Sequence, residues 1–245
     1  MKSRLRHHLI IALLVLSCAA AIQITPKQAA QAGGNPVQQA WKKARRIGSY
    51  RYSTDITQST WPLLVVENVG KAATEERIYI QGRTDLYEES MALRLWSGGG
   101  SAATGQESLE IRVEDGLALG RVGDGPWQEI EDVTGLFAPG RDALSYLAGA
   151  QDIEALGTEN RGTVSFTRYA FNIDGSAFAE HVRAQMETEL QNTGKLPPGL
   201  SLKTIDLYRD MTGHGEIWLD ADGLPIRQII HATFPPTDHE QVKAT

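Results

Sequence analysis

Apolar and polar side chains alternate over much of the chain, and this spacing predicts β-strands with one buried face. In residues 49–59, Tyr50, Tyr52, Thr54 and Ile56 occupy every second position. Gly-rich or Asp-Gly turns separate further segments of this kind, which span residues 75–85, 86–96, 108–116, 117–122 and 127–132. We therefore expect the middle of the chain to form an antiparallel meander.

Three segments favour helices. Residues 36–47 follow Asn35, an N-cap residue, start with Pro36 and stop at Gly48, which matches the known preferences at helix ends. A long helix is predicted from Ser176, the candidate N-cap, to Gly194, and its narrow apolar stripe consists of Phe178, Val182, Met186 and Leu190. A shorter helix is predicted for residues 142–148. We expect these helices to pack on the sheet.

The last third of the chain predicts a long strand and a hairpin. In residues 162–175 the apolar positions change phase, which indicates a bulge or a sheet covered on both faces. Residues 213–236 predict two strands around a turn at residues 221–223, with Ile226, Ile230 and Phe234 on one face of the second strand. No further strand is evident after residue 236.

The first residues have the form of an export signal. Lys2, Arg4 and Arg6 precede an apolar block from Leu9 to Leu16. As a helix this block would cover only about 12 Å, against about 30 Å of bilayer hydrocarbon. It is therefore expected to be a signal sequence and not a permanent span.

Two cleavage sites compete. Residues 15–18 resemble a bacterial lipobox, in which Cys18, the single cysteine of the chain, would carry the lipid and become the new N-terminus. In the other interpretation, signal peptidase cuts after Ala21. The first predicts a signal peptide at 1–17 and an anchor on the extracytoplasmic face of a bacterial membrane; the second predicts a secreted or periplasmic soluble protein.

The composition and net charge of the chain limit the kinds of partner that we expect it to bind. Loss of residues 1–17 removes three basic side chains and no acidic ones, which moves the formal charge from −6 to −9. An acidic body without a basic cluster argues against nucleic acid or anionic lipid headgroups as primary partners. Residues 18–34 are rich in Ala, Gln and Gly and predict a flexible tether, which leaves residues 35–245 as one folded domain.

The sequence gives little support for catalysis. His181, His214, His231 and His239 occur in no pair with metal-ligand spacing, and no nucleophile or phosphate-loop motif is present. An Asp-x-Asp-Gly string at residues 220–223 resembles the start of a calcium loop, but the later ligands are missing, so a solvated turn is favoured. We expect neither an enzyme, nor a cofactor, nor a metal site.

The final hairpin resembles that of the LolA-like superfamily, which includes the LppX- and LprG-type envelope lipoproteins. The matching residues are Trp218, Asp220, Gly223, Leu224, Pro225 and Arg227, and the helix at 36–47 followed by the strand from Ser49 matches the opening of the superfamily. The resemblance implies a single α+β domain with a curved antiparallel sheet, an unclosed half-barrel, and helices packed against its concave face. It also implies a cavity that holds a lipid or lipidated molecule in the cell envelope.

Apolar residues of the predicted strands and helices are the candidates for lining such a cavity; they are Trp41, Leu93, Leu95, Phe166, Phe171, Phe178, Val182, Ile217 and Ile230. An empty cavity of several hundred Å³ would be destabilising, at about 24 cal/mol per Å³, which favours a lipid occupant. In the alternative, large side chains including Trp96 plug the space, and the domain is a structural or sensory module that binds a protein. Residues 98–106 are the expected flexible lip.

Overall fold

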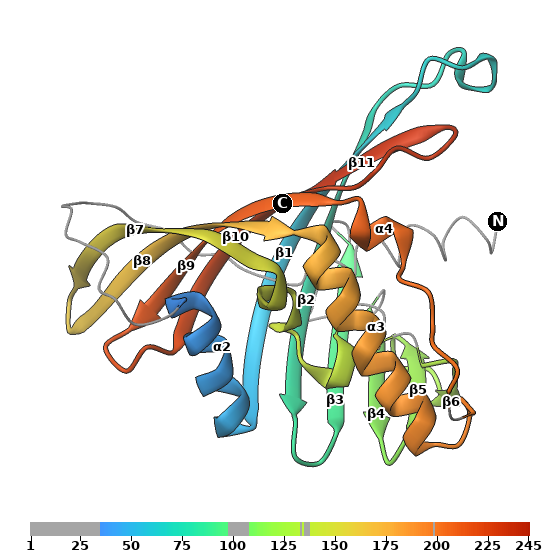
Figure 1. Cartoon of the computed structure of the whole chain (residues 1–245). Helices are drawn as coiled ribbons and strands as arrows, with labels where there is room; N and C mark the ends of the chain where they lie inside the picture. The colour runs from blue at the N-terminus through green and yellow to red at the C-terminus, as the bar shows by residue number, and fades with distance from the viewer. Residues whose placement is uncertain (1–34, 98–107, 133, 135–137, 198) are drawn as a thin grey trace.

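The computed structural model describes residues 35–97, 108–132, 134, 138–197 and 199–245. Eleven strands form one sheet in the order β6-β5-β4-β3-β2-β1-β11-β10-β9-β8-β7, and every neighbouring pair is antiparallel. Because β6 and β7 stand at opposite ends, the sheet is not closed (Figure 1). The fold class predicted from the sequence, α+β with an unclosed antiparallel sheet, is confirmed.

The sheet consists of two meanders. The first contains β1 (Ser49–Pro62), β2 (Thr74–Asp85), β3 (Ser90–Ser97), β4 (Leu109–Glu114), β5 (Leu117–Val122) and β6 (Gln128–Glu129). The second contains β7 (Ala150–Arg161), β8 (Val164–Asp174), β9 (Thr212–Asp220) and β10 (Pro225–Thr233). In the first meander the predicted strands at 86–96 and 127–132 are shorter than expected, because residues 86–89 form the β2–β3 turn and β6 has only two residues.

Strand β11 (Glu240–Ala244) joins the two meanders, since it pairs with β1 on one side and β10 on the other. The expectation that no strand follows residue 236 was therefore wrong. Val242 and Ala244 alternate with more exposed residues and are buried at 4% and 2% exposure. Two apolar positions are too few to stand out in a polar sequence, and the strand is fixed by pairing along both of its edges.

Strand β7 was not predicted at all. Its pairing with β8 shifts register between Gln151 and Glu154 and again between Ala155 and Gly157, so the alternation expected of a strand is broken. These bulges lie opposite β8, whose own pairing with β9 is regular. The phase change predicted in β8 has the second explanation offered for it: Phe171 is buried on the helix-covered face, and Phe166 is buried on the other.

Helices cover the concave face of the sheet (Figure 1). Helix α2 (Pro36–Ile47) has the predicted bounds, and the Asn35 side chain accepts hydrogen bonds from the backbone of Val37 and Gln38. Helix α3 (Gly175–Asn192) is capped by Asp174 and not by Ser176. The helix predicted at 142–148 is instead a 3₁₀ turn, η4 (Ser145–Gly149), after η3 (Pro139–Arg141), and a short helix α4 (Asp206–Arg209) packs on α3.

The core is one apolar cluster between these helices and the concave face. It includes Val37 and Trp41 from α2, Val182 from α3, and Ile56 and Ile217 from the two meanders. Among the described residues, this one cluster includes side chains from elements between α2 and β11.

Candidate functional site

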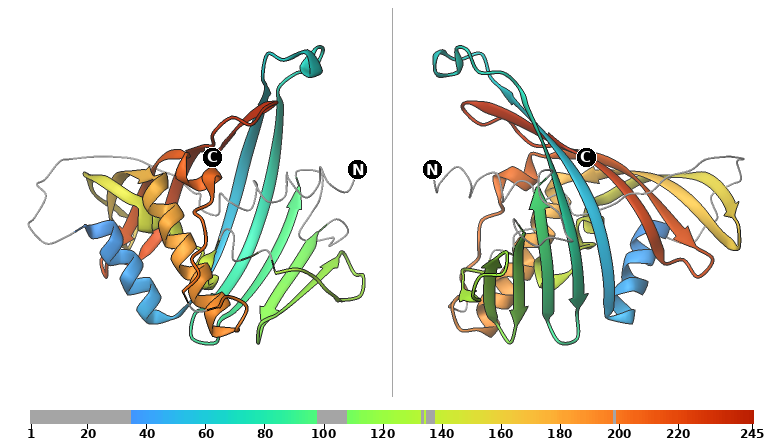
Figure 2. Two further views of the ribbon diagram at one scale, coloured as in Figure 1. Left: turned by 45° about the vertical axis from the view of Figure 1, so that its right-hand side comes forward. Right: turned by 180° about the vertical axis from the view of Figure 1, so that it is seen from behind.

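The candidate site arises because β11 is short. It pairs with β1 only over Gln58–Pro62 and with β10 only at Ala232 and Thr233, and Thr57 and Thr245 then exchange two backbone hydrogen bonds of 2.7 and 2.9 Å. Beyond this point, no described strand lies between the first half of β1 and the first half of β10. Seen from behind, α2 is visible between these two strands (Figure 2, right).

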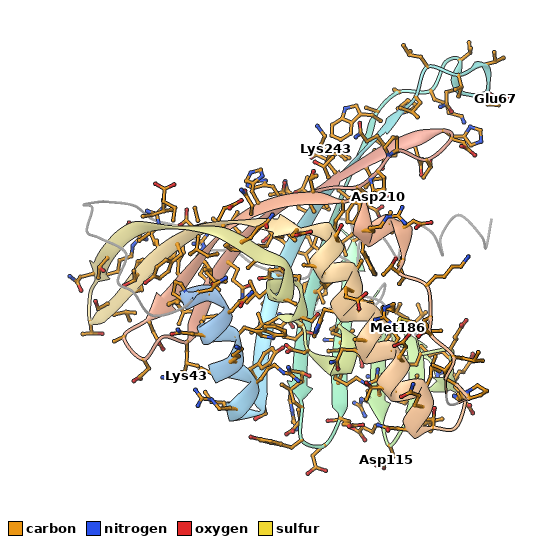
Figure 3. The ribbon with its side chains drawn as sticks, in the orientation of Figure 1. Lys43, Glu67, Asp115, Met186, Asp210 and Lys243 are labelled. Atoms are coloured by element: carbon orange, nitrogen blue, oxygen red, sulfur yellow. The ribbon has the colours of Figure 1, made fainter. Side chains whose placement is uncertain are left out.

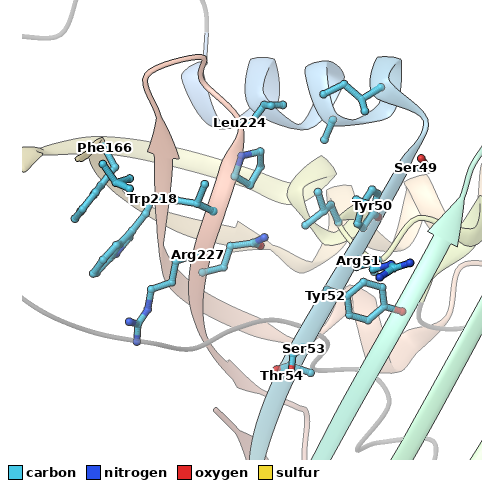
Figure 4. Close-up of a pocket in the computed structure, with 18 of the residues that line it drawn as sticks. Ser49, Tyr50, Arg51, Tyr52, Ser53, Thr54, Phe166, Trp218, Leu224 and Arg227 are labelled. Atoms are coloured by element: carbon cyan, nitrogen blue, oxygen red, sulfur yellow. The ribbon is translucent and has the colours of Figure 1, made fainter. Parts of the chain in front are cut away.

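A pocket of about 720 Å³ occupies this position, and we call it the slot (Figure 4). Its volume lies within the range of small-molecule sites. The slot is lined from both sides of the break in the sheet, by Ala44, Ile47, Ser49, Tyr50, Arg51, Tyr52, Ser53, Thr54, Ala143, Leu144, Arg161, Val164, Phe166, Trp218, Leu224, Pro225, Ile226, Arg227 and Gln228. It therefore connects the space beneath α2 with the convex face of the sheet.

The slot has two chemically distinct ends. Alternate residues of a strand point to opposite faces. The even-numbered residues of β1, such as Tyr52 and Thr54, therefore lie on the helix-covered side with Ala44 and Leu144. Odd-numbered Arg51 points to the convex side. The same rule places Gln228 beneath α2 and Arg227 on the convex side.

An aromatic pair forms one wall on the convex side. Phe166 and Trp218 stack with ring centroids 4.6 Å apart and an interplanar angle of 6°. Three arginines surround the Trp218 ring, with guanidinium carbons 5.4 Å (Arg161), 5.5 Å (Arg168) and 4.8 Å (Arg227) from its centroid. The wall thus combines an apolar aromatic surface with the positive charges of the neighbouring arginines.

The charge of Arg168 is matched by two carboxylates. It bonds to Glu216 at 2.5 and 2.9 Å and to Glu159 at 2.7 Å. The bonds to Glu216 raise the pKa of Arg168, against an opposing effect of burial, and Glu159 adds to the rise. Arg161 lies 3.5 Å from the same Glu159. Arg168, Glu159 and Glu216 do not line the slot, whereas Arg161 and Arg227 do.

Asp142 fixes the wall formed by α2. Its carboxylate, 5% exposed, accepts hydrogen bonds from the Trp41 indole N–H at 2.7 Å, the Tyr50 hydroxyl at 2.7 Å and the backbone N–H of Leu144 at 3.0 Å. Burial raises the pKa of Tyr50, and the negative charge of Asp142 raises it further. One buried side chain thereby connects α2, β1 and the turn that carries Leu144.

Both ends of α2 are attached to the second meander as well. The Asn35 side chain donates to the carbonyl of Ala150 at 3.0 Å, and the Lys43 ammonium donates to the carbonyl of Asp222 in the β9–β10 turn (Figure 3). The Asp220 carboxylate closes that turn, because it accepts from the N–H of Leu224 at 2.8 Å. These bonds hold α2 across the break in the sheet.

Two uncharged side chains of the slot, Tyr52 and Gln228, each have a buried oxygen without a hydrogen-bond partner among the described residues. Gln228 is only 8% exposed, and Tyr52 is buried well enough to raise its pKa, with a smaller contribution from Asp142. The Tyr52 ring lies against Gly82, where any Cβ would come within 2.1 Å of it. Buried polar groups normally have partners. The Gln228 oxygen therefore marks where a ligand group would be stabilised, whereas the Tyr52 hydroxyl lies over Gly82 of β2 (Figure 4).

Ile226 shows why the hairpin was only partly predictable. The register between β9 and β10 shifts between Pro225 and Arg227, which leaves Ile226 as the bulged residue. It is 48% exposed at the slot, whereas Ile230 and Phe234 are buried as expected. The prediction that all three share one buried face was wrong for Ile226, because the bulge interrupts the alternation.

Of the nine residues predicted to line a cavity, Phe166 lines the slot. The other eight lie together in the buried core; they are Trp41, Leu93, Leu95, Phe171, Phe178, Val182, Ile217 and Ile230. Trp96, a candidate plug, stacks on Tyr79 with centroids 5.6 Å apart and is not among the core residues. Sequence reasoning missed the slot residues of β1 and β10, because the slot depends on where β11 stops pairing.

Other chemistry finds little support in the described part of the chain. It contains no group of three or more His, Cys, Asp or Glu side chains placed to hold a metal ion. The rings of His214 and His231 stack with centroids 4.8 Å apart, outside the slot. None of the described helices is both long and apolar enough to span a bilayer. Cys18, the tether at 18–34 and the whole of the expected lip at 98–106 lie outside the described residues.

Comparison with known proteins returned structures but no sequence relatives. No family model matches the chain, and no curated protein matches it. Among solved structures, the chain is similar to the lipoprotein LppX from Mycobacterium tuberculosis, with 13% identity, 86% of this chain and 90% of that chain covered, and a TM-score of 0.33. It is also similar to LprF from Mycobacterium bovis, with 9% identity, 86% and 89% covered, and a TM-score of 0.36.

LppX is one of the lipoproteins that the sequence resemblance named. Because both TM-scores are below 0.5, nothing about the ligand of this chain follows from them.

Proposed function

We propose that the chain is an exported envelope lipoprotein that binds or carries a lipid or lipidated molecule, without catalysis. The observation that supports this most is the slot of about 720 Å³, whose walls include Phe166, Trp218 and Leu144. Burial of acyl chain stabilises the complex by about 0.8 kcal/mol per CH₂. A carrier therefore needs an apolar site of adequate volume and no reactive group.

The test is native mass spectrometry of residues 35–245 purified from a bacterial host, with organic extraction of any bound mass. Ser53→Trp should remove the lipid adduct, because this residue lines the slot and a Trp would fill it. Ser59→Trp is the matched control, since it makes the same change on the same face of β1 where β11 is paired. An unaltered adduct in Ser53→Trp, with both variants folded, would contradict binding in the slot.

Anchoring is a separate part of the proposal. If Cys18 carries the lipid, the full-length protein should fractionate with membranes and gain the mass of acyl chains, and Cys18→Ala should lose both properties. The lipid would then hold the domain at the extracytoplasmic face, with residues 18–34 as the tether. A soluble product that begins after Ala21 in the unmodified chain would support the secreted or periplasmic alternative.

A second candidate is a non-catalytic structural or sensory module that binds a protein partner. It is favoured by the packing of eight predicted lining residues into one buried core cluster. In that case the domain should show its bare mass and take up neither phospholipid nor acylated peptide. The two functions are thus separated by the same mass measurement.

A further inference from the structure

The charges that line the slot are all of one sign. Among the described lining residues, Arg51, Arg161 and Arg227 are cationic and none is acidic. The whole chain has a formal charge of −6, with 30 acidic and 24 basic side chains. A pocket lined only by arginine charges is therefore unlike the rest of this acidic protein.

The arginines lie at the convex end of the slot. Arg51 and Arg227 point to the convex face from the two facing strands, and Arg161 and Arg227 lie over the Trp218 ring. The carboxylates on the same face are Glu159 and Glu216, which bond to Arg168, and Asp220, which is opposite Phe166 in the register. None of the three lines the slot. The arginines at the mouth therefore offer a local site for an anion, although the net charge of the chain argues against anionic headgroups as primary partners.

The pairing of β1 with β2 adds to this charge. Arg51 is directly opposite Arg83 in the register. Like charges directly opposite each other on one face of a sheet are destabilising. An anion at the convex mouth would offset this repulsion, and guanidinium groups bind carboxylate and phosphate in a favourable planar geometry.

At the opposite end, the lining residues are uncharged, and the Asp142 carboxylate lies behind Tyr50 and Leu144. Ala44 of α2 and Leu144 lie there, and the unpartnered Gln228 oxygen lies on the same side of the sheet. A side-chain amide oxygen accepts hydrogen bonds, so Gln228 would pair with a hydroxyl or amide of the ligand. The slot thus combines a cationic mouth, an uncharged apolar interior and a few buried polar atoms.

We propose that the slot binds an anionic amphiphile, with a phosphate or carboxylate headgroup at Arg51, Arg161 and Arg227 and its apolar chain beneath α2. This inference rests on the proposed function and adds the class of ligand. Lipids of the same chain length without a net negative charge should bind more weakly. In phosphatidylcholine, for example, the choline cation opposes the attraction of the phosphate to the arginines.

The experiment is a titration of residues 35–245 with soluble short-chain phosphatidylglycerol and phosphatidylcholine of identical chains, followed by tryptophan fluorescence. We expect phosphatidylglycerol to bind at least about tenfold more tightly than phosphatidylcholine at about 0.1 M salt. The preference should decrease at about 1 M salt, because the Debye length is shorter there. Arg51→Gln and Arg227→Gln should each reduce that preference several-fold, because they weaken phosphatidylglycerol binding more than phosphatidylcholine binding. Arg112→Gln, on an arginine that does not line the slot, is the control.

The outcomes are distinguishable. Equal affinity for both lipids, unchanged in Arg51→Gln, would overturn the anionic ligand and leave the carrier function intact. Failure of both lipids to bind would contradict the carrier function itself and the inference with it. If glycerol 3-phosphate competes as well as phosphatidylglycerol, the arginines form an anion site that does not use the apolar interior, and the amphiphile assignment is wrong.

Discussion

Replacement of Asp142 should loosen α2 and destabilise the domain strongly. In Asp142→Ala, the Trp41 N–H and the Tyr50 hydroxyl lose their acceptor in a buried setting, and Leu144 loses its turn bond. Hydrogen bonds to a charged group contribute about 1.5–3 kcal/mol each, but bonds that share one partner are not additive. Removal of one member of a buried charged network typically costs about 3–5 kcal/mol. We expect a loss of about 4 kcal/mol.

The conservative variant sharpens this prediction. In Asp142→Asn, the remaining oxygen can still accept from Tyr50 and Leu144, whereas the new NH₂ group would face the Trp41 N–H, donor against donor. The expected loss is therefore smaller, about 2 kcal/mol, from one unmade buried bond. Asp222→Ala, in the exposed β9–β10 turn, should change stability by less than about 0.5 kcal/mol.

Urea unfolding followed by circular dichroism and tryptophan fluorescence gives the free energy of unfolding for each variant. If Asp142→Ala lowers it by less than about 1 kcal/mol, Asp142 is not the link between α2 and the sheet. The order Asp142→Ala, then Asp142→Asn, then Asp222→Ala is the result that supports the geometry.

Three further predictions concern packing and pH. Gly82→Ala should destabilise by about 1–3 kcal/mol, because its Cβ would lie 2.1 Å from the Tyr52 ring; a double-mutant cycle with Tyr52→Leu should recover most of the loss, and additivity would argue against the contact. For Glu110, burial acts to raise the pKa, but hydrogen bonds from Arg121 and Arg94 lower it overall. Ionised Glu110 therefore stabilises the folded protein above the unfolded pKa of about 4.5, and this stabilisation is lost as the pH falls through the lower folded pKa. In Glu110→Gln, the free energy of unfolding should depend less steeply on pH below about pH 4.5. Burial, and secondarily the charge of Arg45, lowers the pKa of His181, so the unfolded chain binds a proton first and stability falls as the pH drops below about 6.5. His181→Gln should reduce that slope in unfolding measured between about pH 7 and pH 5, and an unchanged slope would refute the assignment.

The elements that sequence predicted well are those with a local signal. Helix α2 combines an N-cap, a first-turn proline and a C-terminal glycine at 35–48, and its bounds were correct. Strands β1 to β5 alternate in burial over a sufficient length, and the final hairpin contains an Asp-Gly turn. Local chemistry and tertiary structure agree in these segments, so one sequence was enough.

The elements that were missed depend on distant partners. Strand β7 has two bulges, so its pattern does not alternate, and β11 is a strand because β1 and β10 lie on either side of it. The slot is harder still to predict from local sequence, because its position depends on where β11 stops pairing with β1 and β10. No spacing of residues in β1 or β10 reports that position, which explains why only Phe166 was predicted to line it.

The central position of β11 also has a consequence for the order of folding. Gln58 pairs with Ala244, so the two meanders are joined only after nearly all of the described chain is available. Contacts of such large sequence separation slow folding, because the entropy of a long loop is lost before the contact forms. Until then, β1 and β10 would each expose an unpaired edge, which is prone to pair with other chains. The half-folded protein would therefore be the stage at which a holdase chaperone is needed most.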